Sequence, residues 1–167
     1  QLAIPGEAKD WARRYLASSE PAARQWIAVQ AGASDGMKAW HPHSFGQTLA
    51  ELSARWHGGI VLIGSPSEEH TIAEVIQAYR AAGGQNPIKN AAGQTTLSQL
   101  AALLGECRLL LTNDTGPMHL AVAAGTPVID LSVGHVDFRE TGPYGPGHWV
   151  IQPELDCAPC GFEQVCT

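Results

Sequence analysis

Short apolar runs alternate with longer amphipathic segments along most of this chain, and this alternation constrains the fold more than any other feature of the sequence. Each run is rich in β-branched residues or Leu and is bounded by Gly, Pro or polar residues, which is typical of strands in a buried parallel sheet. The runs predict strands at 25–30, 59–64, 108–112 and 127–131. Two weaker signals predict short strands at 87–88 and 148–151.

Helical patterns fill the segments between these strands. They predict helices over 5–17, 44–56, 66–82, 97–105 and 115–124. Ser44 is expected to cap the second of them, and residues 65–68 and 96–99 have the form of capping boxes, with Ser or Thr followed three residues later by Glu or Gln. Strands joined by helices of this length form right-handed βαβ units. The predicted fold class is therefore α/β, with a three-layer, Rossmann-like parallel sheet.

Length and composition limit the classes of protein to consider. The 167 residues are divided here into a linker and leading helix (1–24), one α/β domain (25–152) and a cysteine-containing tail (153–167). Apolar residues make up 44% and charged residues 16%, which supports a buried core and excludes general disorder. No long apolar run and no signal-peptide pattern is visible, so we expect neither a membrane span nor secretion. The net charge of −6 argues against a nucleic-acid binder, which needs a basic surface.

The strand-to-helix turns are the candidate binding positions, because ligands of parallel sheets bind at the carboxyl ends of the strands. The strongest signal is the turn Asn113-Asp114-Thr115-Gly116-Pro117. Gly116 would let a ligand approach the backbone, and the amino end of the following helix favours phosphate. The alternative is that Asp114 or Thr115 merely caps this helix. His119, one turn further on, either faces the ligand or is a hydrogen-bonded structural residue.

Two further charged residues fall at the same predicted edge. Lys38 lies in the irregular loop after the first strand, where an ammonium group can neutralise a phosphate; the alternative is a solvated surface lysine. Glu68 can cap its own helix or accept hydrogen bonds from ribose hydroxyls. The chain lacks the dinucleotide fingerprint Gly-x-Gly-x-x-Gly, and residues 32–38 lack the spacing of a phosphate-binding P-loop.

The four cysteines are unevenly distributed. Cys107 precedes a buried strand and is expected to be a core residue, whereas Cys157, Cys160 and Cys166 lie in the last ten residues. This distribution favours a reduced protein of the cytoplasm over a disulfide scaffold, and we expect no bound metal. The alternative is a zinc or iron–sulfur site made by the three tail cysteines, with a fourth ligand beyond the end of this sequence or from His148.

Five motifs, taken together and in this order, resemble the heptosyltransferase family of bacterial glycosyltransferases, known as glycosyltransferase family 9. The resemblance extends over roughly residues 26–166. It is carried by Gly32-Ala33-Ser34 with Lys38 and Trp40, by residues 62–68 (Leu-Ile-Gly-Ser-Pro-Ser-Glu), by residues 113–121 (Asn-Asp-Thr-Gly-Pro-Met-His-Leu-Ala), by Gly125-Thr126-Pro127-Val128, and by residues 141–146 (Thr-Gly-Pro-Tyr-Gly-Pro) followed by Cys157-Ala158-Pro159-Cys160.

The resemblance implies that this chain is one half of a two-domain GT-B type glycosyltransferase. The half present would bind the nucleotide-sugar donor, and the missing amino-terminal half would bind the acceptor and supply the general base. The implied reaction is inverting, metal-independent and cofactor-free transfer of a sugar, by family default heptose from ADP-heptose, to lipopolysaccharide or a related glycan. The fragment alone would be inactive. The full-length protein would be cytoplasmic, with a peripheral position at the inner membrane left open, and would bind a glycolipid acceptor but no nucleic acid. The alternative is a non-catalytic module that binds a nucleotide or nucleotide sugar.

The resemblance also assigns roles to individual residues. Lys38 is similar to the catalytic lysine that neutralises the departing diphosphate, and Glu68 to the carboxylate that holds the ribose. The other implied donor-binding residues are Gly32, Asp114, Thr115, Gly116 and His119. Residues 131–137 depart from the family pattern, which usually has Phe-Gly-Pro followed by Thr or Ser at this point, so the donor sugar is left open.

Overall fold

The computed structural model describes residues 2–18, 23–134, 136–156 and 158–160. Six strands in this part of the chain form one parallel sheet with the order β3-β2-β1-β4-β5-β6. They are β1 (Trp26–Gln30), β2 (Gly59–Leu62), β3 (Ile88–Asn90), β4 (Leu109–Asn113), β5 (Val128–Leu131) and β6 (Trp149–Ile151). All six predicted strands are confirmed, including the two with weak signals.

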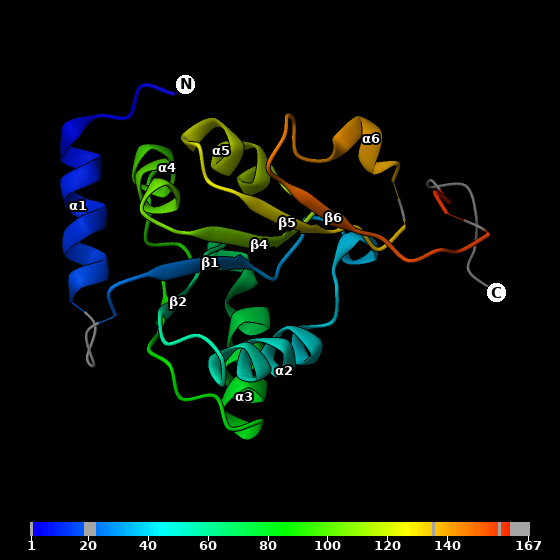
Figure 1. Ribbon diagram of the computed structural model, residues 1–167, viewed down its shortest axis with the longest axis horizontal. Helices are drawn as coiled ribbons and strands as arrows, with labels where there is room; N and C mark the ends of the chain where they lie inside the picture. The colour runs from blue at the N-terminus through cyan, green and yellow to red at the C-terminus, as the bar shows by residue number, and fades with distance from the viewer. Residues whose placement is uncertain (1, 19–22, 135, 157, 161–167) are drawn as a thin grey trace.

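Helices cover both faces of this sheet (Figure 1). One face carries α2 (Pro42–Ser53) and α3 (Glu69–Ala81), and the other carries α1 (Gly6–Ala17), α4 (Leu97–Gly105) and α5 (Gly116–Ala124). The predicted three-layer arrangement is therefore confirmed. The four-residue helix α6 (Phe138–Thr141) was not predicted; it begins after Asp137, whose side chain accepts a hydrogen bond from Arg139 N.

The prediction for the start of α2 is wrong. Ser44 is the third residue of the helix and not its cap. The cap is His41, whose Nδ1 accepts a hydrogen bond from His43 N at 3.2 Å, and Pro42 takes the first helical position, where its fixed φ and missing N–H are tolerated. The helix also ends at Ser53, earlier than the predicted Trp56.

Both predicted capping boxes are present, but only the second opens an α-helix at the expected residue. Thr96 caps α4 as expected: its Oγ1 accepts from Gln99 N at 3.3 Å, and Gln99 Oε1 accepts from Thr96 N at 2.9 Å. After Ser65 the chain first makes a single 3₁₀ turn, η2 (Pro66–Glu68), and the α-helix α3 begins only at Glu69. The predicted helix start at residue 66 is thus three residues early.

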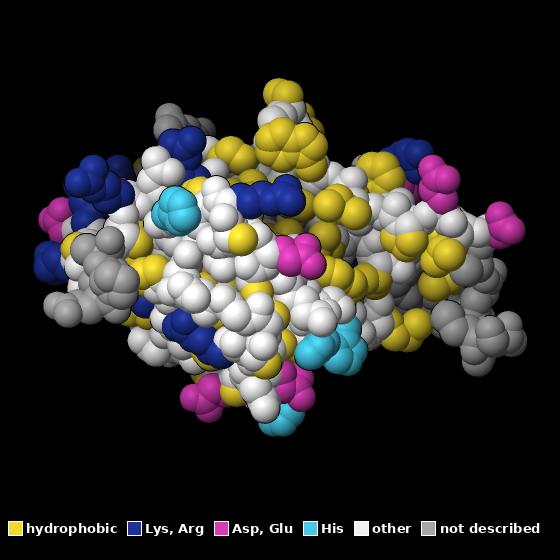
Figure 2. All heavy atoms as spheres, turned by 60° about the horizontal axis from the view of Figure 1, so that its bottom comes forward, with side chains coloured by type: hydrophobic (Ala, Val, Ile, Leu, Met, Phe, Trp, Pro, Cys, Tyr) yellow, Lys and Arg dark blue, Asp and Glu magenta, His cyan; other side chains and the backbone are white. Residues whose placement is uncertain are grey.

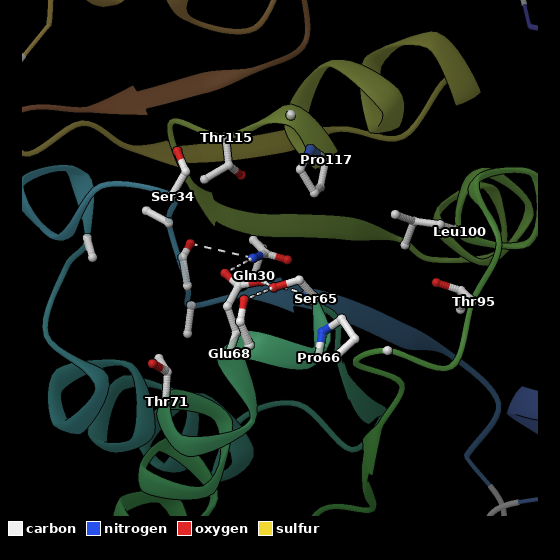
Figure 3. A pocket seen from close by; sticks show the side chains of 18 of the residues that line it. Gln30, Ser34, Ser65, Pro66, Glu68, Thr71, Thr95, Leu100, Thr115 and Pro117 are labelled. Carbon is white, nitrogen blue, oxygen red and sulfur yellow. Dashed lines mark hydrogen bonds between the residues drawn. The ribbon is translucent and has the colours of Figure 1, made fainter.

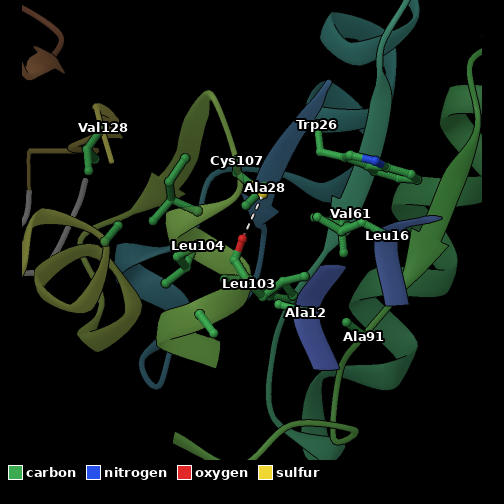
Figure 4. Packing of buried hydrophobic residues seen from close by; sticks show 14 of the residues in the cluster. Ala12, Leu16, Trp26, Ala28, Val61, Ala91, Leu103, Leu104, Cys107 and Val128 are labelled. Carbon is green, nitrogen blue, oxygen red and sulfur yellow. Dashed lines mark hydrogen bonds between the residues drawn. The ribbon is translucent and has the colours of Figure 1, made fainter. Parts of the chain in front are cut away.

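The core consists of two clusters, one on each face of the sheet, because successive strand residues point to opposite faces. Ala28 of β1 belongs to the cluster under α1, α4 and α5, and its neighbour Val29 belongs to the cluster over α2 and α3. Cys107 lies in the first cluster, and its Sγ donates to Leu103 O at 3.2 Å (Figure 4). The prediction that Cys107 is a core residue is confirmed.

The strand order fixes where a ligand can bind. From β1 the chain continues to β2 and β3 on one side, and from β4 it continues to β5 and β6 on the other. The loops that follow β1 and β4 therefore diverge and leave a crevice at the carboxyl ends of these two strands, which is the usual ligand position in such sheets. No helix in the described part of the chain has the length and apolar character that a membrane crossing requires.

Candidate functional site

A pocket of about 860 Å³ occupies this crevice, within the size range of small-molecule sites (Figure 3). Its walls come from the loops after β1, β2, β3 and β4. Four of the residues predicted for the site line it: Gly32, Glu68, Thr115 and Gly116. The structure thus brings together residues that lie up to 84 positions apart in the sequence, from 32 to 116.

The β2 side of the pocket is organised around the carboxylate of Glu68. Its Oε2 accepts hydrogen bonds from Ser65 N at 2.6 Å and from Ser65 Oγ at 2.7 Å. Its Oε1 accepts from Gln30 Nε2 at 2.8 Å. Glu68 therefore caps the turn that leads into α3, as one of the two interpretations predicts, and also lines the pocket, so that capping and ligand binding are compatible.

Gly32 makes room for this carboxylate. A Cβ atom at position 32 would lie 1.7 Å from Glu68 Oε1, far inside van der Waals contact. A Cβ at Gly64 would lie 3.1 Å from Glu68 Oε2. Both glycines therefore leave space for a side chain of the protein itself, and a larger residue at position 32 would displace Glu68 from its present place.

The β4 side of the pocket is open backbone at the amino end of α5. Thr115 occupies the N-cap position, but its side chain makes no capping hydrogen bond to the helix; its Oγ1 lies 3.1 Å from Thr112 Oγ1. A Cβ at Gly116 would meet no atom within 4 Å. Neither Thr115 nor Asp114 caps α5 through its side chain, so the helix end, with its positive dipole, remains available to an anion.

Lys38 and Asp114 form an ion pair at the rim of this pocket. Lys38 Nζ lies 3.7 Å from Asp114 Oδ2, and the same oxygen accepts a hydrogen bond from Thr141 Oγ1 at 2.8 Å. The two side chains are 22% and 9% exposed, so Lys38 is not a freely solvated surface lysine. Its chain neighbours at 36 and 39 line the pocket, whereas Lys38 and Asp114 themselves lie just outside the lining.

Sequence analysis placed Asn113 in the candidate turn but gave it no role of its own. It is fully buried; its Nδ2 donates to Ala31 O at 2.8 Å and its Oδ1 accepts from Trp40 N at 2.9 Å. These bonds attach the end of β4 to the loop that carries Lys38. The available signal was a polar residue at the carboxyl end of a predicted buried strand. The same signal marks Gln30, which also escaped the prediction.

The structure separates His119 from the other predicted residues. It lines a different hollow, of about 450 Å³, together with residues of α6 and the loop that follows it, among them Phe138, Tyr144 and His148. The Nδ1 atom of His148 accepts a hydrogen bond from Val128 N at 3.2 Å.

Asp130 on β5 is a buried carboxyl group without a hydrogen-bond partner for either oxygen among the described residues. Its register partner on β4 is Thr112, two residues before Asp114. Burial, and to a lesser degree the negative charge of Asp114, raise the pKa of Asp130 to about 7. The charge near the Lys38–Asp114 pair therefore changes around neutral pH.

The predictions for metal and cysteine chemistry are only partly covered by the described residues. Among these, no group of three His, Cys, Asp or Glu side chains is placed to hold a metal ion. Cys157 and Cys166 lie outside the described residues, so the alternative of a metal site in the tail stays a hypothesis. Burial, and then the charge of Glu106, raise the pKa of the Cys107 thiol to about 12, which makes it a poor nucleophile.

Charged side chains show no concentration of one sign on the face seen in Figure 2. Lys and Arg side chains lie in several separate places there, with Asp and Glu between them. On the described residues of this face there is no continuous basic surface, in keeping with the net charge of −6.

Comparison with known proteins matches the chain to bacterial heptosyltransferases. The lipopolysaccharide core heptosyltransferase OpsX of Haemophilus influenzae is 29% identical over 86% of this chain and 39% of its own length. Lipooligosaccharide heptosyltransferase 2 of Haemophilus ducreyi is 36% identical over 62% of this chain and 30% of its own length. The solved structure of the Escherichia coli ADP-heptose lipopolysaccharide heptosyltransferase II superposes with a TM-score of 0.74 at 26% identity, over 96% of this chain and 50% of that one.

The chain thus spans 30–39% of the length of these two curated relatives. The family model described as glycosyltransferase family 9 (heptosyltransferase) matches residues 4–167, nearly the whole sequence. The doubly wound sheet, the crevice between β1 and β4 and the five motifs all agree with this match. This chain therefore belongs to glycosyltransferase family 9, the heptosyltransferase family.

Proposed function

We propose that this chain is the donor-binding domain of an inverting, metal-independent glycosyltransferase that transfers a sugar from a nucleoside diphosphate to lipopolysaccharide or a related glycan. The observation that carries the proposal is the pocket between β1 and β4, which has an uncapped helix end on one side and a fixed carboxylate on the other. The first suits a diphosphate and the second suits ribose hydroxyls. Residues 25–152 would form this domain, between the leading segment 1–24 and the tail 153–167.

The proposed chemistry uses a small number of groups. An acceptor hydroxyl, deprotonated by a base outside this chain, attacks the anomeric carbon as the bond from that carbon to the diphosphate oxygen breaks. Negative charge then grows on the departing oxygen. Lys38 and the N–H groups around Thr115 and Gly116 would stabilise this charge, which removes the need for a metal ion. Asp114 would orient Lys38, and His119 stays a proposed donor contact.

The relatives support a proposal for the donor and for the place of the reaction. ADP-heptose is favoured because it is the donor named for the similar Escherichia coli structure. The acceptor site and the general base would lie in an amino-terminal domain outside this chain, in agreement with the chain's partial coverage of its relatives. The intact protein would work in the cytoplasm or as a peripheral protein at the inner membrane, where a glycolipid acceptor is found.

Calorimetric titration of the intact protein with ADP, UDP and AMP tests the proposal. We expect heat of binding with ADP, weaker binding of UDP, and a large loss of affinity for AMP because its single phosphate gains less from the helix end and Lys38. No heat with either diphosphate at millimolar concentration would contradict the proposal. Transfer of radiolabelled sugar to a lipopolysaccharide acceptor then separates an enzyme from a non-catalytic module.

A further inference from the structure

Gln30 is the one polar residue of β1, and it lies at the carboxyl end of that strand, where the chain enters the pocket. The whole strand is buried, and Gln30 itself is only 3% exposed. Burying an amide lowers stability unless both of its polar atoms find partners. An apolar residue at this position would continue the apolar pattern of the strand. The presence of an amide here therefore indicates a role other than stabilising the fold.

Only the nitrogen of this amide makes hydrogen bonds to the described residues. Nε2 donates to Glu68 Oε1 at 2.8 Å and lies 3.5 Å from Gly32 O (Figure 3). Oε1 is buried and has no partner among the described residues. The reverse orientation of the amide would place its oxygen against the carboxylate, so the charge of Glu68 fixes the direction of the group. The protein keeps an unsatisfied acceptor in order to present one donor to Glu68.

This donor acts on one oxygen of Glu68 alone. Oε2 is held by Ser65 N and Ser65 Oγ, three residues away on the same turn, and these bonds suffice for capping. Oε1 is held from another strand, by Gln30. Without Gln30 the capping bonds could persist, but the direction of Oε1 would no longer be set. Gly32 has no side chain that could set it instead.

We propose that Gln30 is a positioning residue that aims Glu68 Oε1 at the ribose hydroxyls of the donor and thereby gives the site its preference for ribonucleotides over 2′-deoxyribonucleotides. A carboxylate oxygen accepts more than one hydrogen bond, so Oε1 can keep the bond from Gln30 and accept a hydroxyl from the pocket. This inference rests on the proposed function, in which the Glu68 side of the pocket binds ribose.

Titration of the intact protein with ADP and with 2′-deoxy-ADP tests the inference. We expect the wild-type protein to bind ADP about tenfold more tightly, the difference expected from one hydrogen bond to a charged group. Gln30→Met keeps the length of the side chain but removes the donor, and should lower this ratio to about two or less. Its Tm should change little, because the variant also removes the buried, unpaired Oε1.

A matched control loses one amide hydrogen bond elsewhere. Gln94 Nε2 donates to Asn90 O at 2.9 Å, and the residue does not contact Glu68. Gln94→Met should therefore keep the tenfold ratio. Gln30→Glu is a second variant of similar size that places an acceptor against Glu68; it should abolish the preference and weaken ADP binding as well.

The outcomes separate the two proposals. If the wild-type protein binds no nucleoside diphosphate, both the proposed function and this inference fail. If it binds ADP and prefers it, but Gln30→Met keeps the same preference, the proposed function stands and the inference is overturned. The inference is also overturned if the wild type binds both nucleotides equally, if Gln94→Met loses the preference as well, or if neither Gln30 variant folds.

Discussion

The two sides of the pocket are built in opposite ways. On the β2 side, the side chains of Gln30, Ser65 and Glu68 bond to one another at 2.7–2.8 Å and occupy the space in front of Gly32. On the β4 side, the backbone at the start of α5 is bare, and a Cβ at Gly116 would meet nothing within 4 Å. Gly32 leaves space that the side chain of Glu68 occupies, whereas Gly116 leaves space that a ligand can occupy.

This difference matches the two chemical parts of the proposed ligand. A hydroxyl group needs one acceptor in a fixed direction, which the bonded side chains provide. A diphosphate carries a large charge over many oxygens and is better served by N–H groups and a cation than by one aimed side chain. The cation proposed for the diphosphate, Lys38, accordingly lies on the β4 side, where it pairs with Asp114.

The largest effect expected on the β4 side concerns Asp130. Its folded-state pKa is raised to about 7, so the folded protein retains a proton that the unfolded chain releases above about pH 4. The contribution of Asp130 to the free energy of unfolding should therefore fall, by up to about 4 kcal/mol, as the pH rises from 4 to 7. Asp130→Asn should remove this part of the fall. Urea unfolding of both proteins at several pH values from 4 to 8 measures it, and parallel pH profiles for the two proteins would contradict the prediction.

The second largest expected effect is the loss of turnover when Lys38 is replaced. In the intact protein, Lys38→Ala should lower kcat about 100-fold, the loss typical when one preorganised group that stabilises developing charge is removed. KM for the donor should change much less, because the charge that Lys38 meets is greatest as the diphosphate departs. Steady-state kinetics with the sugar donor measures both values. Lys9→Ala on the exposed face of α1 is the control, and equal turnover in wild type and Lys38→Ala would refute the assigned role.

The two glycines provide a direct comparison of the two sides. Gly116→Ala should leave Tm unchanged, because the new methyl group enters open space, but should weaken ADP binding about tenfold by occupying part of the phosphate site. Gly32→Ala should instead lower the free energy of unfolding by about 1–3 kcal/mol, because the methyl group must displace Glu68. Calorimetry and thermal unfolding of both variants measure the contrast. If both variants lost stability equally, the two sides would not differ as described.

The fold could be predicted from the sequence because its signals are local. Each strand is a short apolar run with Gly, Pro or polar residues at its ends, and the capping box at 96–99 is complete within four residues. The start of α2 could not be predicted, because His is an uncommon N-cap residue whereas Ser, which stands three positions later at residue 44, is a common one. The helix α6 was missed because four residues are too few to show a helical period.

The site was predictable only in part, for a related reason. Gly32, Glu68, Thr115 and Gly116 sit in turns whose position follows from the strand order. Gln30 and Asn113 act through partners 38 and 82 residues away, which no local pattern reveals. A polar residue at the carboxyl end of a buried strand is the common feature of both, and it becomes informative only when the strands are known to meet at one edge.

The smallest expected effect concerns α6, which the sequence did not predict. A substitution in this helix tests whether it helps to hold the Lys38–Asp114 pair on the β4 side of the pocket. Thr141 Oγ1 donates to the oxygen of Asp114 that pairs with Lys38, so Thr141→Val should free Asp114 and loosen Lys38 without altering the pocket wall. Loss of one such bond is worth about 0.5–1.5 kcal/mol, which corresponds to a decrease in kcat of about two- to tenfold with KM for the donor unchanged. Ser53→Ala removes a hydroxyl bond of similar length at the far end of α2 and should leave kcat unchanged. If Thr141→Val lowered Tm but not kcat, Thr141 would support only the fold, and the β4 side would consist of α5, Lys38 and Asp114 alone.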